Sequence, residues 1–446
     1  MNSENTLLEK VNNWIKNSVT LKLITIMILM LLLLIPSEMI RSIISERKEL
    51  RELAIQEVSA KWATDQLLNG PVLTIPLLYE IEKDNKKVRN TKYFHILPEE
   101  LIISGRIEPE KLKRGIYEVV VYRSDLSITG WFRLNKYFDR TNLVQVLYDQ
   151  AFITFGISDL RGIENQIVLK WKNQEIPVES GSKLEDMIHT GLTVNLPEIS
   201  EDLTEKLEFE LDLNLQGSHN ISFIPLGNET KVEITSGWPS PSFNGNFLPD
   251  DREITDEGFS AYWKVLQLNR NFPQSWIGSS QMQNIADSAF GVDLILPVDD
   301  YQKSIRSAKY AVMTIALTFL IFFMSEILNK RKIHPFQYAL VGLAICLFYV
   351  LLISITEHLD FNTAYLLSTM AIIALISLYS LSVFRVIKFS LLLTITLTGI
   401  YGFLFVTLQL SDYALLLGSI GLTLILAATM YFTRNINWYK LNMKND

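Results

Sequence analysis

Cysteine is nearly missing from this chain of 446 residues, and histidine is scarce. The single cysteine, Cys346, excludes an intrachain disulfide, so the fold cannot be stapled even in an oxidising compartment. The five histidines are scattered. His334 and His358 flank one apolar run, so a bilayer of about 30 Å would separate them. We therefore expect no metal site and no cofactor.

Short catalytic motifs are missing too. The chain contains no G-x-x-x-x-G-K-[ST], G-x-S-x-G, H-E-x-x-H or C-x-x-C sequence. Adjacent acids occur at Asp250/Asp251 and Asp299/Asp300, but neighbouring residues of a strand usually point apart, whereas a general acid and base must converge. We therefore predict a protein without catalytic residues.

Basic charge is in deficit in the middle of the chain. Residues 41–307 contain 40 Asp and Glu but 29 Lys and Arg, a net charge of −11, and the remaining residues carry +4. Because nucleic-acid binding needs a basic face for the phosphates, this balance argues against a nucleic-acid partner.

Long apolar runs, in contrast, are abundant. A membrane-spanning helix needs about 20 apolar residues. Six runs are long enough or nearly so, at residues 21–40, 308–328, 336–356, 363–384, 389–409 and 413–432. The sequence therefore predicts an integral membrane protein, with the lipid bilayer as partner, one N-terminal helix and a bundle of five C-terminal helices at 308–432.

The charges of the short loops predict the orientation of these runs. Lys and Arg lie in the N-terminal tail, after the second run, after the fourth run and after the sixth run, whereas the opposite loops hold Glu357, Asp360 and Asp412. By the positive-inside rule, both termini, with tails at 1–20 and 433–446, are cytoplasmic. Residues 41–307 then lie on the outer side of the membrane.

The first run has two interpretations. A charged start followed by Leu23–Ile35 resembles a signal peptide, but PSEMI offers no A-x-A-like cleavage site, which favours an uncleaved anchor. The mixed-charge sequence after Pro36 predicts that the helix continues as a stalk over 41–69.

The middles of the runs lack charge. Glu326, Glu357 and Arg385 stand at run ends, where we expect their side chains to reach the interface. Ion-coupled transporters usually carry charges deep in the bilayer, so this pattern weakens an ion-coupled carrier.

From Gly70 to residue 307 the sequence predicts a large β-rich, sandwich-like domain. LEFELDLNLQ (207–216) alternates apolar and polar residues without a fault, as a half-buried strand does. ISFIPL and TKVEITS follow after turn residues, which predicts a β-meander. A division into two lobes near 180–205 is an additional expectation.

The segment SGWPSPSFNGNFLP (236–249) has a loop composition but holds three large aromatic residues. Disordered linkers avoid such residues, which argues against a tether. Two interpretations stay open: an ordered crossover whose rings plug the sandwich, or a surface-facing recognition loop. The candidate recognition residues are Trp238, Pro239, Pro241, Phe243, Asn244 and Phe247.

Several long stretches resemble one family, the CreD family of bacterial inner-membrane proteins, associated with cell-envelope integrity and colicin E2 tolerance. The resemblance covers nearly the whole chain in order, through GPVLTIP (70–76), LPEEL (97–101), RGIYEVVVY (114–122), SHNISFIPLGNETKVEITSGWPSPSFNGNFLP (218–249), GFSAYWKVLQLNRNFPQSW (258–276), FGVDLILPVDDYQKSIRSAKYA (290–311) and HPFQYALVGLAICLFYVLL (334–352). It implies one N-terminal span, a large periplasmic domain, a C-terminal bundle and a role in envelope physiology. It brings no catalytic residues.

Three functional hypotheses follow. The first is a non-enzymatic envelope protein whose outer domain binds an envelope component or a membrane-protein partner. The second is lipid or small-molecule handling by the five-helix bundle, which is larger than anchoring requires. The third is a membrane-bound enzyme acting on cell-wall material through Asp250, Asp251 or His219.

Overall fold

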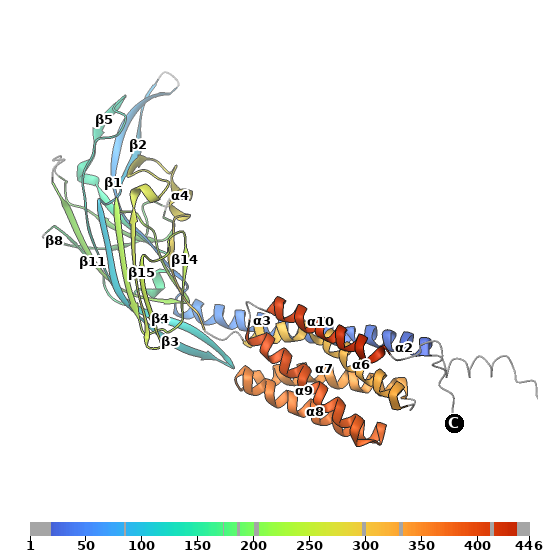
Figure 1. Ribbon diagram of the computed structural model, residues 1–446. Coiled ribbons are helices and arrows are strands. Elements are labelled where there is room, and N and C mark those ends of the chain that lie inside the picture. Colours follow the sequence, from blue (N-terminus) through green and yellow to red (C-terminus); the bar gives the residue numbers. More distant parts are fainter. Residues whose placement is uncertain are drawn as a thin grey trace, which may run out of the picture. The chain divides into compact units, whose positions relative to one another are not determined.

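The protein is described from a computed structural model (Figure 1). Two compact units form the chain, Met1–Leu50 together with Val298–Asp446, and Arg51–Pro297. We call them the membrane unit and the β-unit. Most of both predicted tails, residues 1–18 and 435–446, lies outside the described residues. The structure describes residues 19–83, 86–172, 174–184, 188–199, 205–296, 300–329, 333–410 and 414–434.

Helices occupy all six predicted apolar runs. The helices are α2 (Val19–Leu32), α3 (Leu34–Trp62), α5 (Asp300–Lys309), α6 (Ala311–Asn329), α7 (Pro335–Thr356), α8 (Phe361–Phe384), α9 (Ile387–Gln409) and α10 (Ala414–Thr433). In the described part of the chain, four stretches are long and apolar enough to cross a membrane: Leu21–Trp62, α7, α8 and α9. A fifth results if α5 and α6, which are bent by 42° relative to each other, form one span.

The C-terminal helices pack through small and aromatic residues. On α8 the buried side chains recur every three or four residues and include Ala364, Ser368 and Ser380, whereas Leu366 and Leu378 are exposed. This is the arrangement expected in lipid, where small residues let helices approach and large apolar residues face the acyl chains.

The predicted stalk is helical, and strand structure begins earlier than expected. Helix α3 ends at Trp62, and β1 starts at Gln66 instead of Gly70. Gly70 itself lies within β1 and precedes a cis peptide bond to Pro71.

Two mixed sheets make up most of the β-unit. The first sheet has ten strands, with the order β14-β18-β12-β1-β6-β10-β9 and with β2, β5 and β17 off this path. Its strands are β1 (Gln66–Lys83), β2 (Lys86–Ile96), β5 (Leu143–Val146), β6 (Phe152–Ile157), β9 (Glu179–Ser180), β10 (Gly191–Asn195), β12 (Asn220–Phe223), β14 (Pro241–Gly245), β17 (Ser275–Ile277) and β18 (Phe290–Leu294).

The second sheet has eight strands in the order β15-β16-β13-β3-β4-β11-β7-β8. They are β3 (Glu100–Arg114), β4 (Tyr117–Phe132), β7 (Val168–Trp171), β8 (Gln174–Pro177), β11 (Leu207–Ser218), β13 (Glu229–Ser236), β15 (Asp251–Thr255) and β16 (Gly258–Leu266). Short elements complete the unit: η1 (Tyr148–Gln150), η2 (Leu160–Gly162), η3 (Gln267–Asn269) and α4 (Met282–Ala286).

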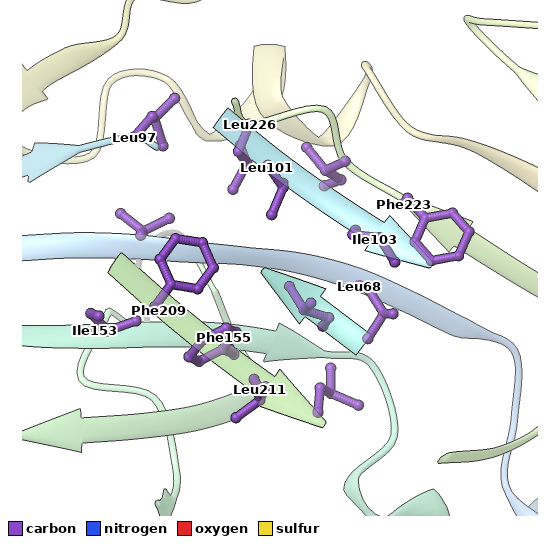
Figure 2. Close-up of a cluster of buried hydrophobic side chains, with 14 of the residues drawn as sticks. Leu68, Leu97, Leu101, Ile103, Ile153, Phe155, Phe209, Leu211, Phe223 and Leu226 are labelled. Atoms are coloured by element: carbon purple, nitrogen blue, oxygen red, sulfur yellow. The ribbon is translucent and has the colours of Figure 1, made fainter. Parts of the chain in front are cut away.

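One hydrophobic core lies between the two sheets. Figure 2 shows Leu68 and Phe155 of the first sheet gathered with Leu101 and Phe209 of the second. The alternation predicted for LEFELDLNLQ is confirmed, because the apolar residues of 207–216 are buried and their polar neighbours are not. The sandwich-like architecture predicted from the sequence is therefore present.

The predicted meander is wrong. Strand β12 belongs to the first sheet and runs parallel to β1, whereas β11 and β13 belong to the second. The cause lies at His219, which has a left-handed φ of 55° between β11 and β12. Its N–H donates to Val120 in one sheet, and its C=O accepts from Leu294 in the other.

The two-lobe expectation is corrected as well. In each sheet, strands from before 180 pair with strands from after 205: β4 with β11, β3 with β13, and β1 with β12. The β-unit is therefore continuous across that region of the sequence.

Candidate functional site

The segment 236–249 is ordered and forms part of the first sheet. Its residues Pro241–Gly245 are β14, which pairs with β18. Trp238 is only 7% exposed, and its indole N–H donates to the carbonyl oxygen of Ile295 at 2.9 Å. The ammonium of Lys111 lies 5.6 Å from the centroid of the Trp238 ring. Trp238 therefore joins this segment to the end of β18.

The two phenylalanines of the segment contact the core. Phe243 packs edge-on against Phe259 and Trp263, with ring centroids 5.9 and 5.7 Å apart, and Phe247 packs against Phe290 at 5.9 Å. Both rings are partly buried. This is the arrangement that the ordered-crossover interpretation predicts.

The polar and proline residues of the segment are less covered. Pro239 is exposed, and Pro241 and Asn244 are partly buried within or beside β14. A Cβ at Gly245, where φ is 85°, would lie 2.2 Å from the Ala289 carbonyl oxygen, so this turn requires glycine. Recognition by the segment stays a prediction.

The residues of the enzyme hypothesis lie in different parts of the sandwich. Asp250 and Asp251 are exposed at the start of the edge strand β15, and the Asp250 carboxylate accepts the Lys264 N–H at 2.7 Å. His219 lies between β11 and β12, where burial, and then the charge of Arg51, lower its pKa. Among the described residues, no contact joins His219 to either aspartate.

Polar groups near His219 bind mainly one another. Asn220 donates to a carboxylate oxygen of Asp293 at 2.7 Å, and the Tyr122 hydroxyl donates to the Asn220 carbonyl at 2.8 Å. Asp65 is an exposed residue, but its neighbours partly desolvate its carboxyl group. This desolvation, and then the charge of Asp293, raise the pKa of Asp65. Within the described ranges, no group of three His, Cys, Asp or Glu residues is arranged to hold a metal ion.

A different residue, Arg270, is the most unusual charged group of the β-unit. It follows η3, after the end of β16, and its guanidinium donates to the carbonyl oxygens of Phe272 at 3.1 Å, Leu226 at 3.0 Å and Gly227 at 3.4 Å. It also donates to the side-chain oxygen of Gln274. All four acceptors are neutral.

One face of the guanidinium stacks on an aromatic ring, since its central carbon lies 4.1 Å from the centroid of Phe272. The Nε atom is buried and has no hydrogen-bond partner in the described structure. Burial lowers the pKa of Arg270 to about 10, which leaves the group charged at neutral pH. Arg270 is therefore a partly buried cation whose charge no described carboxylate neutralises.

Arg270 lines a hollow of about 580 Å³ that opens to solvent. Four side-chain amides and an almost fully exposed leucine surround it, and none of its lining residues is acidic. The polar and apolar neighbours are Gln267, Leu268, Asn271, Gln281 and Asn284. We call this site the Arg270 hollow.

The wall of the hollow is anchored to the first sheet. The N–H of Leu97 donates to the Gln274 carbonyl at 3.0 Å, and β17 pairs with β2. There Trp276 lies opposite His95, with the two ring centroids 5.4 Å apart. A connection between strands is thus held in one conformation by backbone bonds and ring packing.

Sequence reasoning missed the Arg270 hollow. In the sequence, the stretch LNRNFPQ contributes only to the family resemblance. An arginine between two asparagines and before Phe-Pro is a weak signal, because its partner Leu226 and the lining residue Gln281 come from other segments.

The membrane unit contains a buried charge of the opposite sign. Glu326 on α6 is 0% exposed, so the expectation that it reaches the interface is wrong. Its carboxylate forms an ion pair with Lys22 and accepts from the Tyr338 hydroxyl at 2.9 Å and the Ile333 N–H at 2.8 Å. We call these four residues the Glu326 cluster. It joins α2, α6 and the start of α7.

Comparison with known proteins agrees with the architecture. A family model described as the inner membrane protein CreD matches residues 18–439. The inner membrane protein CreD of Escherichia coli strain K12 is 34% identical to this chain over 417 residues, which cover 93% of this chain and 92% of that protein. These matches also place the chain in the inner membrane as a multi-pass protein. The chain therefore belongs to the CreD family of inner membrane proteins.

Proposed function

We propose that this protein contributes to cell-envelope integrity by binding an envelope component or a membrane partner through its β-unit, without catalysing a reaction. The observation that carries the proposal is the Arg270 hollow. It presents an unneutralised cation and several amides to solvent on a scaffold held by two sheets. Concave sites with a few fixed polar groups are where ligands usually bind.

We further propose that both termini are cytoplasmic and that residues 41–307 are periplasmic. The support is the distribution of Lys and Arg over the short loops. Cys346 is buried, so a cysteine introduced at Leu268 provides a clean probe. A membrane-impermeant maleimide should label Leu268→Cys in intact spheroplasts. Labelling only after lysis would contradict this orientation.

A catalytic role has less support. The candidates Asp250 and Asp251 stand on an exposed edge strand, where the Asp250 carboxylate accepts a backbone N–H. An acid–base mechanism needs two groups within hydrogen-bonding reach of one substrate. Replacing Asp250, Asp251 and His219 one at a time with alanine should leave complementation intact, and loss of complementation by a folded variant would revive the enzyme hypothesis.

Transport of lipids or small molecules by the membrane helices also has less support than the binding function. The space between α7, α8 and α9 is occupied by a cluster of large rings around Phe348, whose centroid lies 4.9 Å from Tyr349, 5.4 Å from Tyr365 and 4.7 Å from Tyr401. A lipid-sized cavity would require these side chains to move together.

The proposed function is tested by site-specific photo-crosslinking in cells. The crosslinker is placed at Leu268, which is 93% exposed at the Arg270 hollow, at Leu248 in the 236–249 segment, and at Val168 on β7 as a control. We expect an adduct with envelope material at Leu268 but not at Val168. An adduct at Leu248 alone would show that the 236–249 segment, and not the Arg270 hollow, is the binding site.

A genetic experiment tests the same proposal. Deleting the gene should raise sensitivity to detergents, antibiotics or colicin under envelope stress, and the full chain should restore resistance. Unchanged sensitivity, together with no adduct at Leu268 or Leu248, would overturn the proposed function.

A further inference from the structure

We propose that the Arg270 hollow binds a sugar that carries a carboxylate or a phosphate group. This inference rests on the proposed binding function of the β-unit and names the class of ligand.

Arg270 has no counter-ion among the described residues. A buried cation is normally paired with a carboxylate, because hydrogen bonds to neutral carbonyls do not neutralise it. Arg270 has only carbonyl and amide acceptors among the described residues, although residues 41–307 carry 40 Asp and Glu. Acidic residues are thus plentiful in the domain but absent from the lining of this hollow.

A purely structural role does not account for this charge. A hydrogen bond to a backbone carbonyl does not by itself need a charged donor, since the neutral amide of Gln274 donates to the Pro98 carbonyl nearby. A guanidinium, in contrast, has five N–H donors in a plane and binds carboxylate and phosphate groups in preference to other acceptors.

The remaining lining residues suit hydroxyl groups. Gln267, Asn271, Gln281 and Asn284 each offer amide donors and an acceptor, which match the donor and acceptor character of a hydroxyl. Only the bond from Asn284 to Gln281, at 3.1 Å, links two of them. The lining therefore combines one anion-binding group with several hydroxyl-binding groups.

The size of the hollow and one apolar side chain are also consistent with a sugar ligand. The volume of about 580 Å³ lies within the usual range of about 300–1,000 Å³ for ligand sites. Leu268 projects into solvent at the rim and can cover the C–H face of a sugar ring. Because the hollow opens to solvent, it can accept one unit of a larger saccharide.

The direct test uses the full-length protein in nanodiscs of phosphatidylcholine, which has no net charge. Isothermal titration calorimetry with D-glucuronate, glucose 6-phosphate, glucose and inorganic phosphate separates the contributions. We expect the two anionic sugars to bind about tenfold more tightly than glucose, because a hydrogen bond to a charged group contributes about that much. They should also exceed inorganic phosphate. No binding of either anionic sugar would overturn the proposal, and equally tight binding of inorganic phosphate would overturn its saccharide part.

Variants at Asn284 test the site without removing Arg270. Asn284 is exposed on the short helix α4, so its substitution should not unfold the sheet. Asn284→Asp should weaken both anionic sugars about fivefold and Asn284→Lys should tighten them, since exposed charge pairs contribute up to about this much. The control Asn90→Asp, on β2, changes the net charge as Asn284→Asp does but lies away from the hollow. It should leave the affinity for both anionic sugars unchanged. Equal affinities in all three variants would overturn the assignment.

Arg270→Gln provides the final comparison. It keeps two of the side-chain donors and removes the charge, and circular dichroism checks that the variant folds. Anionic sugars should then bind about tenfold more weakly and glucose unchanged. If crosslinking at Leu268 and complementation persist in a variant that binds no anionic sugar, the ligand class is wrong while the proposed function stands.

Discussion

The two units bury opposite charges in opposite ways. In the membrane unit Glu326 is completely covered and meets Lys22, a tyrosine hydroxyl and a backbone N–H. In the β-unit Arg270 meets neutral acceptors only and faces a hollow. The difference teaches that satisfying hydrogen bonds and neutralising charge are separate requirements. Where both are met within the protein, the group is structural, and where the charge has no counter-ion, the site is open to a ligand.

The largest effect should come from breaking the Glu326 cluster. Glu326→Leu leaves Lys22 without its counter-ion, and removing one partner of a buried pair costs about 3–5 kcal/mol. Lys22→Met should cost a similar amount. The double variant should be much less unstable, because neither charge remains. Unfolding in mixed micelles of increasing dodecyl sulfate content measures this.

A matched control for that cycle is Arg41→Met with Glu38→Leu, an exposed pair on α3 at 2.9 Å. Exposed pairs contribute about 0–1 kcal/mol, so coupling there should be small. If the loss of stability in the double variant Lys22→Met/Glu326→Leu equalled the sum of the losses in the two single variants, Lys22 and Glu326 would not be coupled electrostatically.

His95 represents a third solution, burial without charge. It is 3% exposed, one ring nitrogen lies 3.0 Å from the Thr74 hydroxyl, and burial lowers its pKa to about 4. Its contribution to stability is complete above the unfolded pKa of about 6.5 and is lost as pH falls toward 4. The loss reaches about 3 kcal/mol, since each pKa unit corresponds to about 1.4 kcal/mol.

Urea unfolding followed by tryptophan fluorescence at pH 7 and pH 4.5 measures this loss. His95→Gln cannot ionise and should flatten the pH dependence over this range. His189→Gln, at an exposed position, should leave the slope unchanged. An identical slope in His95→Gln would assign the acid sensitivity to other groups.

A smaller loss is expected from Arg270→Met. The substitution leaves the carbonyl oxygens of Leu226 and Phe272 without their donor, which costs about 1–3 kcal/mol. It orphans no opposite charge, so the loss should be smaller than that of Glu326→Leu. The free energy of unfolding in urea measures it. A loss as large as that in the Glu326 cluster would mean that Arg270 neutralises an acid after all.

The sequence predicts the inner faces of strands far better than those of membrane helices. In β11 one face meets core and the other meets water, so Leu211 and Asp212 differ in polarity and their burial follows. On α8 both faces meet apolar surroundings. Its buried Ser368 is more polar than its exposed Leu378, so hydropathy alone would give the wrong face.

Connections between strands were the main failure in predicting the fold. The alternation in ISFIPL and TKVEITS identified strands correctly, but strand pairing depends on where the chain turns. The backbone of His219 bonds to both sheets at once, and no local pattern announces such a crossover. For the same reason the sequence left two interpretations of Trp238 open, because its partner Ile295 lies 57 residues away.

The candidate sites were predictable only in part. Absence of catalytic motifs could be read directly, whereas the Glu326 cluster joins residues 304 positions apart. Arg270 can be recognised as a candidate site only from its neighbours in the folded chain. A missing carboxylate is a tertiary property that no pattern around LNRNFPQ encodes.

The smallest effect is expected where neutral groups meet in the membrane unit. The hydroxyls of Ser380 on α8 and Ser390 on α9 lie 2.5 Å apart and are buried. Interhelical bonds of this kind contribute on average about 0.6 kcal/mol, because the separated helices also find partners. A double-mutant cycle of Ser380→Ala and Ser390→Ala should therefore show coupling near this value. Pairing Ser380→Ala with Thr396→Ala, whose exposed hydroxyl bonds within its own helix, should show none. Coupling of several kcal/mol would mean that satisfying a hydrogen bond in this unit matters as much as neutralising a charge.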